Sequence, residues 1–241
     1  IYIIQEMYKQ MNDADTSGLK TIGTDPYVGE TPQTALGSWL TPNSLFYVRS
    51  QFDYPDIDEN TWKLNAVSSA GDEISLSLDE IKQLPKHTVT VTLECAGNNR
   101  SDLNPPAPGN QFNNGAVSNA VWSGTSLKSI LSKMNLGQDV VEILFEGADV
   151  GSPAADKDAE PYLRSLPLDL AMHEDTLLAY EMNGETLPLE HGYPIRLIIP
   201  GWYGMAHVKW VNKISSITTP FSGYFQGEKY VLKYDDGTER P

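Results

Sequence analysis

An α+β fold of mixed β-sheets with short helices is the architecture that this sequence predicts, and three observations indicate it. Threonine and valine alternate over residues 88–93, which is typical of a strand. Asn183 and Gly184 separate two apolar runs, and both positions of a type I′ hairpin turn need positive φ. Apolar side chains recur at helical spacing over residues 127–134. Hairpins mixed with short helices favour α+β over regular alternation of strands and helices.

The other elements are predicted from alternation, capping residues and clusters of turn formers. Residues 1–36 are polar and rich in turn formers, which indicates an extended N-terminal arm. Up to residue 85 the expected elements are an apolar run at 45–48, an acidic loop at 53–59, strands at 62–67 and 73–78, and a short helix capped by Asp79 and stopped by Pro85. Beyond residue 100 they are loops at 104–114 and 147–160, a helix capped by Thr125 and closed by Gly137, strands at 140–145, 195–199 and 208–217, and a helix at 168–172.

Composition excludes several classes of partner. The formal net charge of −15 would repel a nucleic-acid backbone or an anionic membrane surface, so we expect neither as a partner. No run approaches the ~18 consecutive apolar residues of a membrane span, and residues 1–10 lack the pattern of a signal peptide. We therefore expect a soluble protein, with the cytoplasm and an exported location both open. The single cysteine excludes an intrachain disulfide and a Cys-x-x-Cys-His haem attachment, so no haem is expected in this chain.

Cys95 is the residue whose surroundings point most clearly to chemistry. It follows the alternating strand in the segment Thr-Leu-Glu-Cys-Ala-Gly-Asn-Asn-Arg at residues 92–100, where small residues let a ligand approach closely. A lone cysteine is commonly a small core hydrophobe. Arg100 in the same turn would favour the thiolate, which is the form that binds soft metals or attacks electrophiles. Both interpretations remain open on this segment alone.

This segment resembles the cysteine-containing loop of the sulfite oxidase family, and two later segments resemble the same family in the same order. The second is residues 115–127. The third comprises His-Gly-Tyr-Pro-Ile-Arg at 191–196, Pro-Gly at 200–201 and His-Val-Lys-Trp at 207–210. The resemblance implies a sulfite-oxidase-type molybdopterin-binding domain in which Cys95 ligates molybdenum, and cofactor phosphate and pterin are held by His191, Arg196 and Lys209. The forked donors of arginine and the point charge of lysine suit phosphate oxygens.

Further contacts to the cofactor are implied by the same resemblance. Phe46 and Arg49 lie in the apolar run at the family's cofactor-binding segment, and Arg49 matches an arginine that reaches both substrate and cofactor. Gln51 stands where the family carries a histidine, and a glutamine can hydrogen-bond a pterin edge. Asp149 and Ser165 occupy family positions near the pterin.

The resemblance also implies a substrate and a reaction. Arg49, Arg100 and Tyr230, which matches the family's active-site tyrosine, would hold the oxygens of sulfite while it is oxidised to sulfate by oxygen-atom transfer. The cofactor would carry the redox chemistry, and the protein would supply orientation and charge. An external acceptor, a cytochrome or oxygen, would take the electrons. Short-range charge-assisted hydrogen bonds outweigh distant screened charges, so the acidic net charge does not exclude an anionic substrate.

The implied domain organisation has three parts. The arm at 1–36 precedes a molybdenum-cofactor catalytic domain at 37–220, and a C-terminal segment at 221–241 carries Tyr230. The immunoglobulin-like dimerisation domain that is usual in the family is not expected before Pro241. A homodimer is therefore expected only for a longer chain.

Three alternatives stay open. The same cofactor domain serves reductases of nitrate and of sulfoxides; the pair Arg49 and Arg100 favours an oxyanion over a neutral sulfoxide but does not separate sulfite from nitrate. A cofactor-free binding or structural domain with a buried thiol is the second alternative. Hydrolysis by a Cys95 nucleophile with His191 as its base is the third, and it would need both side chains within hydrogen-bond reach.

Overall fold

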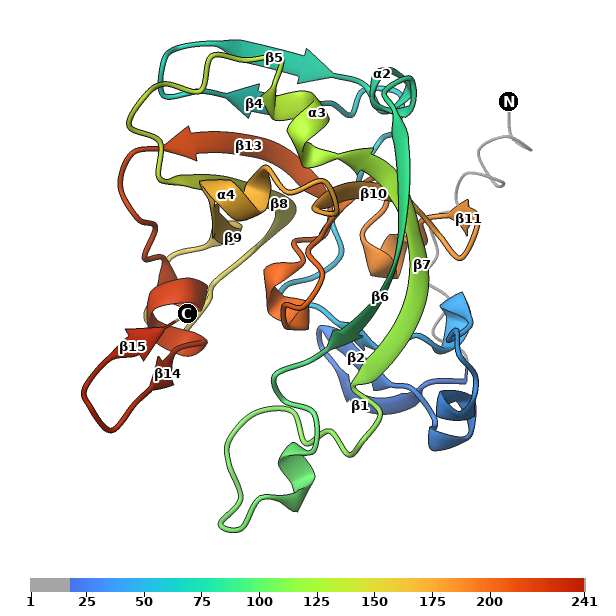
Figure 1. Ribbon diagram of the computed structural model, residues 1–241. Coiled ribbons are helices and arrows are strands. Elements are labelled where there is room, and N and C mark those ends of the chain that lie inside the picture. The colour runs from blue at the N-terminus through green and yellow to red at the C-terminus, as the bar shows by residue number, and fades with distance from the viewer. Residues whose placement is uncertain (1–17, 241) are drawn as a thin grey trace.

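Three β-sheets form the body of the protein (Figure 1). Cys95 directly follows a strand of the middle sheet. The computed structural model describes residues 18–240. The strands of the middle sheet are β6 (Lys86–Glu94), β7 (Val117–Ser126), β10 (Leu177–Met182), β11 (Glu185–Thr186) and β12 (Arg196–Ile198). Their order is β11-β10-β7-β6, with β12 paired to β10, and all pairings are antiparallel. Strands β6 and β7 stay in register as far as Glu94, so the chain leaves the sheet at Cys95.

The second large sheet is mixed. Its strands, in the order β5-β4-β13-β8-β9, are β4 (Leu64–Val67), β5 (Glu73–Leu76), β8 (Glu142–Gly151), β9 (Glu160–Pro167) and β13 (Val211–Ile217). Strand β13 runs parallel to β4 and antiparallel to β8. The parallel pairing joins residues 65–67 to residues 213–215, and no local sequence pattern indicates so distant a partner.

The N-terminal part of the chain forms a small antiparallel sheet, so the extended arm expected at 1–36 is wrong for its described residues. Residues 1–17 lie outside the described part of the chain. The strands are β1 (Lys20–Thr24), β2 (Tyr27–Glu30) and β3 (Val48–Arg49). The buried Glu30 carboxylate accepts hydrogen bonds from the backbone and side-chain nitrogens of Asn113 at 2.7 and 2.9 Å. These contacts tie the hairpin to the body, and local composition does not reveal them.

Two hydrophobic cores lie on opposite faces of the middle sheet. Along β10, Leu178 and Tyr180 belong to the core that the two large sheets share, whereas Leu177 and Ala179 belong to the core against the N-terminal sheet. This alternation follows the two-residue period of a strand, and both faces are apolar because both are covered. The middle sheet is therefore the central layer of the molecule.

The helices are few and short. Within residues 18–240 the α-helices are α2 (Leu78–Lys82), α3 (Leu127–Leu131) and α4 (Leu168–Ala171), and a π-helical segment, η6 (Tyr224–Lys229), lies near the C-terminal end. The other helical elements are 3₁₀ turns: η1 (Gln33–Gly37), η2 (Asn43–Leu45), η3 (Arg100–Asp102), η4 (Leu189–His191) and η5 (Gly204–Ala206). Together with the mixed sheets they agree with the predicted α+β class. Within residues 18–240, no helix is long and apolar enough to cross a membrane.

The cap expected for the first helix was placed two residues too late. Ser77, not Asp79, caps α2: its Oγ accepts a hydrogen bond from the Glu80 backbone N–H, and the Glu80 carboxylate accepts one from the Ser77 backbone N–H at 2.8 Å. This reciprocal capping box satisfies two backbone donors, where Asp79 would satisfy one. The helix ends before Pro85, as predicted.

The cap and the end expected for the second helix are also wrong. Thr125 lies inside β7, where it pairs with Leu178, and Ser126 is the residue that precedes α3. The helix ends at Leu131, well short of Gly137. Its apolar face is nevertheless buried as predicted, through Leu127, Ile130, Leu131 and Met134.

The predicted hairpin turn is present, and two other predicted boundaries are shifted by a few residues. Asn183 and Gly184 have φ values of 53° and 81° between β10 and β11, which confirms the hairpin turn. The loop expected at 147–160 is shorter, because β8 and β9 extend into it from both sides. The strand expected from residue 208 begins at Val211, since Trp210 has a φ of 51° that interrupts extended backbone.

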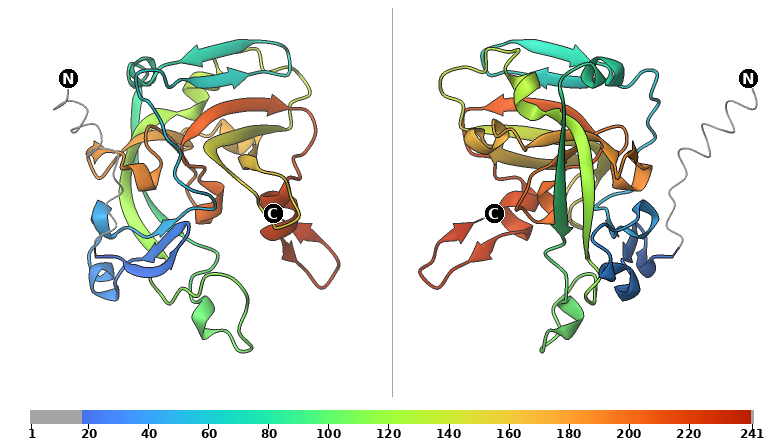
Figure 2. Two further views of the ribbon diagram at one scale, coloured as in Figure 1. Left: turned by 180° about the vertical axis from the view of Figure 1, so that it is seen from behind. Right: turned by 45° about the vertical axis from the view of Figure 1, so that its right-hand side comes forward.

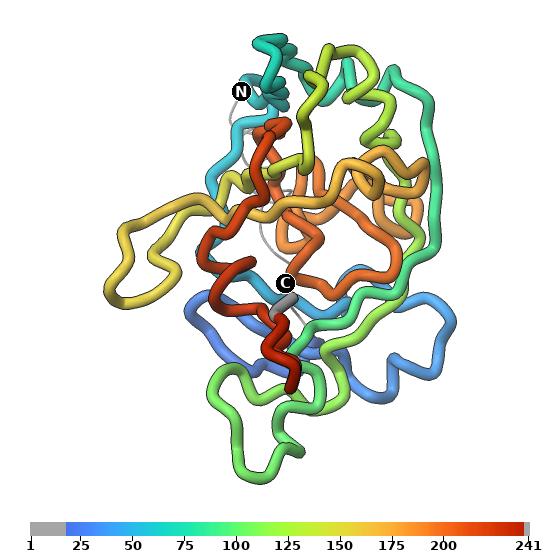
Figure 3. Tube along the Cα trace, turned by 60° about the vertical axis from the view of Figure 1, so that its left-hand side comes forward, coloured from blue at the N-terminus to red at the C-terminus, as the bar shows by residue number. Residues whose placement is uncertain are grey.

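Three segments project from the body of the molecule in different directions. The predicted loop at 104–114 contains no strand or helix and extends away from the sheets below β6 and β7 (Figure 2). The hairpin of β14 (Leu232–Lys233) and β15 (Glu239–Arg240) projects separately at the C-terminal end. The loop between β8 and β9 projects on another side, near the N-terminal hairpin (Figure 3).

Gly124 marks the closest approach of β7 and β10. A Cβ at this position would overlap the backbone of Leu178 and Ala179. We expect Gly124→Ala to lower the free energy of unfolding by about 1–3 kcal/mol, because overpacked cores must shift backbone to relieve contact. Urea unfolding measures it, and Gly37→Ala, where an added Cβ would meet nothing within 4 Å, is the control. Equal stability of the two variants would contradict the close packing.

Candidate active site

A pocket opens where segments from all three sheets meet. It contains about 680 Å³ of empty space, counting its open mouth. Most of the residues predicted for the site line it: Phe46, Arg49, Cys95, Asp149, His191, Arg196, Lys209 and Tyr230. Two predicted residues, Arg100 and Ser165, do not line it.

Cys95 presents its sulfur to the pocket from the turn that follows β6. Its backbone N–H donates to the Ala116 carbonyl at 2.9 Å, and the Gly97 N–H donates to Sγ at 3.4 Å. Burial raises the pKa of the thiol, opposed by the Gly97 N–H and by the Arg49 and Arg100 charges. The free thiol therefore keeps its proton, and a soft metal ion would favour the thiolate by supplying the missing positive charge.

Arg49, Gln51 and Tyr230 form a hydrogen-bonded chain across the pocket. Arg49 Nη2 donates to Gln51 Oε1 at 2.8 Å, and Gln51 Nε2 donates to Tyr230 Oη at 2.6 Å. Burial raises the pKa of Tyr230, with Arg49 opposing it and Cys95 adding to it, so the phenol remains a hydrogen-bond donor at neutral pH. Gln51 thus couples two of the residues predicted to bind substrate.

Arg196 and His191 lie at the deep side of the pocket. Both are buried, and Arg196 donates to the His191 carbonyl from Nη1 at 2.9 Å while its guanidinium stacks 4.9 Å from the Trp122 ring. Burial lowers the pKa of Arg196 to about 10. Burial, with the Arg196 charge, lowers the pKa of His191 to about 3, so its imidazole is neutral, and its Nε2 lies 3.1 Å from the Asn43 carbonyl.

Lys209 brings a second cationic side chain to the same part of the pocket as Arg196. Its Nζ donates to Ser50 Oγ at 2.6 Å and to the Glu190 carbonyl at 2.9 Å, and lies 4.2 Å from the Trp210 ring. Burial, with the Arg196 charge, lowers the pKa of Lys209 to about 7. Asp149 is the carboxylate that opposes this shift, and burial raises the pKa of Asp149 itself to about 6. Positive charge in this part of the pocket is only partly compensated.

Arg100 and Ser165 act from outside the pocket lining. The Arg100 guanidinium lies against Gly109 and Gly97, where an added Cβ would crowd it, yet its charge reaches Cys95 and Tyr230. Ser165 Oγ donates to Glu142 at 2.6 Å, so its hydroxyl is engaged away from the pocket. Ser165 lies on β9, for which no strand was predicted, and the two-residue period of that strand turns a different side chain, Tyr162, into the pocket.

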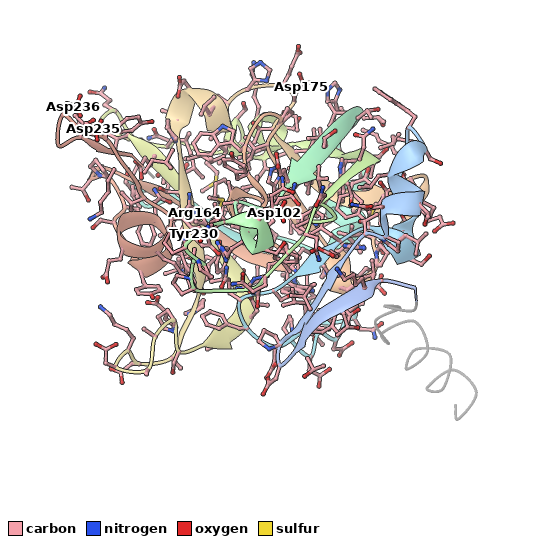
Figure 4. The ribbon with its side chains drawn as sticks, turned by 90° about the horizontal axis from the view of Figure 1, so that it is seen from below. Asp102, Arg164, Asp175, Tyr230, Asp235 and Asp236 are labelled. Carbon is pink, nitrogen blue, oxygen red and sulfur yellow. The ribbon has the colours of Figure 1, made fainter. Side chains whose placement is uncertain are left out.

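Strand β9 also anchors the π-helical segment that precedes Tyr230. Arg164 Nη1 donates to the Phe225 carbonyl at 2.8 Å, and the Gln226 amide makes bonds to Ser165 at 2.9 and 2.6 Å. The Arg164 guanidinium and the Tyr230 phenol lie near each other (Figure 4). The position of the phenol thus depends on contacts between distant parts of the chain.

Several residues that line the pocket were not predicted from the sequence, among them Tyr47, Tyr162 and His207, each of which carries a polar group on its ring. Tyr47 follows Phe46 in the apolar run, and that position is the sequence feature that could have identified it. For Tyr162 the only such feature is the alternation of side chains along a strand. His207 belonged to the His-Val-Lys-Trp segment but was given no role. Its Nδ1 accepts from the Ile199 N–H at 3.1 Å and its Nε2 lies 3.1 Å from the Trp202 carbonyl, which requires the neutral ring protonated on Nε2.

We expect the two buried histidines to make the fold acid-sensitive. Burial lowers the pKa of His207, like that of His191, to about 3. The unfolded state therefore binds more protons than the folded state below about pH 6.5, and stability falls as the pH falls from there toward 3. The slope for each histidine approaches about 1.4 kcal/mol per pH unit.

Urea unfolding between about pH 7.5 and 5.5 measures this slope. His207→Gln should flatten it by roughly one histidine's share, because glutamine does not titrate. His173→Gln is the control, since that side chain is 60% exposed. A slope that His207→Gln leaves unchanged would contradict the neutral buried ring.

The amino-acid sequence matches the family described as the oxidoreductase molybdopterin binding domain over residues 51–225. The chain belongs to this family. Mitochondrial sulfite oxidase of Rattus norvegicus is 38% identical over 85% of this chain and 38% of its own length. NADH nitrate reductase of Spinacia oleracea is 33% identical over 90% of this chain and 24% of its own. The crystal structure of the sulfane dehydrogenase SoxCD from Paracoccus pantotrophus superposes with a TM-score of 0.77 and 25% identity, over 97% of this chain and 58% of that chain.

These relatives confirm the predicted sulfite-oxidase-type fold, and the chain spans less than two thirds of each of them. The residues of this molybdopterin-binding domain also fit the cofactor. Arg196 Nε is buried without a hydrogen-bond partner among the described residues, although both other guanidinium nitrogens are bonded. A phosphate oxygen or a pterin edge would satisfy that donor. The phosphate would also place a negative charge near the Lys209 amine.

A metal ion would need ligands from the cofactor as well as from the protein. Among residues 18–240, no group of three or more His, Cys, Asp or Glu side chains is placed to hold a metal ion. Cys95 offers one soft donor at the pocket wall. The donor set therefore suits a metal that arrives with its other ligands on an organic cofactor.

Proposed function

We propose that the protein is a molybdenum-dependent oxidoreductase that oxidises sulfite to sulfate. The observation that carries the proposal is the chain Arg49–Gln51–Tyr230 beside the Cys95 sulfur. A guanidinium and a protonated phenol are donors suited to the oxygens of a small anion. Relatives named sulfite oxidase, 38% identical over most of this chain, support sulfite as that anion.

In this proposal the inner half of the pocket holds the cofactor. Cys95 ligates the molybdenum, and Arg196, Lys209 and neutral His191 bind the phosphate and pterin. Phe46 packs edge-on against His191 with ring centroids 5.3 Å apart, which orients the imidazole. Asp149 and Gln51 offer acceptors and donors to the pterin edge. When bound, the cofactor supplies the oxygen that sulfite gains and takes up the two electrons that sulfite loses.

The outer half of the pocket binds the substrate. Arg49 and Tyr230 donate hydrogen bonds to the sulfite oxygens, which leaves the sulfur lone pair directed inward. Arg100 adds positive charge from behind the Cys95 turn without contacting the anion. The rings of Tyr47 and Tyr162, both buried, line the walls and limit access of water. Interactions in such a water-poor site are stronger than the same contacts in solvent.

The proposal extends to partners and boundaries. Electrons pass to an external acceptor, a cytochrome or oxygen, and a homodimer belongs to a longer form of the chain. The cofactor domain covers residues 37–220, with residues 221–241 as a C-terminal segment that contributes Tyr230. The family match over residues 51–225 lies largely within the proposed domain and extends into the C-terminal segment.

Metal analysis followed by an activity panel tests the function. We expect close to one molybdenum per chain in natively purified protein, and sulfite-dependent reduction of ferricyanide or cytochrome c. Nitrate and methionine sulfoxide, offered with a reduced dye, should react far more slowly. Molybdenum-free protein would overturn the proposal, and faster nitrate reduction would replace sulfite oxidation by the reductase alternative.

The hydrolase alternative receives no support from the geometry. His191 Nε2 is engaged with the Asn43 carbonyl, and its lowered pKa makes it a poor base. The raised pKa of Cys95 also disfavours a free nucleophilic thiolate.

A further inference from the structure

A second pocket adjoins the active site on the far side of Arg49 and Gln51. Both residues line it as well as the Cys95 pocket, so they form the shared wall. The second pocket contains about 560 Å³ of empty space, counting its mouth. The N-terminal hairpin, the loop containing Asn110, the β8–β9 loop and η6 enclose it, and Figure 3 shows the hairpin, the β8–β9 loop and the C-terminal segment on one side of the molecule. Neither the family resemblance nor the proposed function uses this space.

Lys229 gives the second pocket a positive charge. Its Nζ lies 3.5 Å from Gln51 Oε1, 5.2 Å from the centroid of the Phe225 ring and 5.9 Å from that of Tyr230. The aromatic rings fix the lysine stem while the amine stays at the pocket wall. Lys157, a neighbour that contacts the same aromatic segment, is instead paired with Glu228 at 3.3 Å.

Like charges crowd around Lys229. Burial lowers its pKa, and the charges of Arg49 and Arg100 lower it further. Lys229, Arg49 and Arg100 repel one another, which raises the electrostatic free energy of the empty pocket. An anion that binds near them reduces this repulsion. In a protein with a formal net charge of −15, such a cluster concentrates positive potential at one opening.

One carboxylate also lines the second pocket. Asp25 lies at the exposed turn between β1 and β2, so its charge faces solvent at the rim. The other polar lining groups, Asn110 and Ser152, are neutral and can donate hydrogen bonds. The inner wall is therefore cationic and the rim carries a single opposing charge.

We propose that the second pocket is an anteroom that binds a small oxyanion between Lys229 and Arg49, outside the Cys95 pocket. Lysine supplies a point charge and arginine a forked donor, a combination that suits sulfite and sulfate alike. The identity of the anion rests on the proposed function. The anteroom raises the local concentration of substrate at the shared wall. Lys229 therefore affects the binding of substrate and not the chemical step.

Sulfate binding to the resting holoenzyme, measured by titration calorimetry at low ionic strength, tests the anteroom without turnover. Wild type should bind a second sulfate beyond the one at the Cys95 pocket. Lys229→Gln should weaken that second site roughly tenfold, as expected for loss of one charged hydrogen-bond donor, and Lys229→Arg should restore it. Lys157→Gln is the matched control and should bind like wild type. Asp25→Asn should tighten the second site by removing the rim carboxylate.

Steady-state kinetics with sulfite provide the second readout. Lys229→Gln should raise KM more than it lowers kcat, and should weaken the dependence of kcat/KM on salt. Identical sulfate affinity and stoichiometry in Lys229→Gln and wild type would overturn the anteroom even if sulfite is oxidised. An enzyme that fails to oxidise sulfite but loses sulfate affinity in Lys229→Gln would retain the anteroom and overturn the proposed function instead.

Discussion

Cys95→Ser will abolish sulfite oxidation while the protein stays folded. Serine is almost the same size as cysteine, and Cys95 is half-buried at the edge of a core, so the free energy of unfolding should change by less than about 1 kcal/mol. The hydroxyl is a hard and poorly ionised ligand, whereas the proposed molybdenum ligand is the soft thiolate of Cys95. The fall in kcat should exceed roughly a hundredfold, because losing a group that merely supports a metal ligand already costs about 10–100-fold.

Turnover, molybdenum content and far-ultraviolet circular dichroism of the same preparation measure the three parts of this prediction. Thr92→Ser is the control, since Thr92 is exposed on the same strand and does not line the pocket. A folded Cys95→Ser protein that retains wild-type turnover would remove Cys95 from the metal site. Loss of activity together with unfolding would contradict the expected structural neutrality of the change.

Lys209→Met will lose the cofactor. Lys209 lines the same pocket as Arg196, whose charge helps to lower the pKa of the lysine, and an anionic ligand would favour the protonated lysine. Removing the charge leaves the phosphate end of the cofactor with fewer donors, at a cost of about 1.5–3 kcal/mol for a charged hydrogen bond. Molybdenum retained after dialysis should therefore fall roughly tenfold or more. Lys213→Met is the control, because Lys213 is 46% exposed on the next strand.

Cofactor-free protein provides an independent test of the same residue. The pKa of Lys209 is about 7 in the folded state and 10.5 is its ordinary value. Between these values the unfolded state binds more protons, so the stability of the cofactor-free wild type should rise with pH by up to about 1.4 kcal/mol per unit. Lys209→Met should lack this rise. An identical pH profile in both proteins would mean that folding does not lower the pKa of Lys209.

Much of the site could be predicted because its residues lie in short segments that resemble a family pattern. The strand before Cys95 alternates clearly, and its end follows from the small residues after it. The cations at 191–209 are close together in sequence, so their meeting in space needed little long-range information. Ser165 shows the limit: the resemblance implied a position near the pterin, but no strand was predicted there, and the side chain that β9 turns into the pocket depends on a register that the neighbouring strand determines.

The features that sequence did not predict depend on distant partners. The N-terminal hairpin looked like an arm because its residues are polar, and its stability comes from buried Glu30 and the pairing with β3. Thr125 looked like a cap, but pairing with Leu178 keeps it extended. Lys229 carried no pattern, because its place at the second pocket depends on how η6 folds back onto β9.

The stacking of three sheets has a mechanical consequence for the enzyme. Arg49 is attached to the N-terminal sheet, Cys95 to the middle sheet, and Tyr230 to the chain that follows β13 of the second large sheet. A small slip of one layer changes the spacing of these three groups before any strand separates. The catalytic rate should therefore respond to a shift of one sheet against another before secondary structure is lost. On mild heating it should decline before circular dichroism detects unfolding.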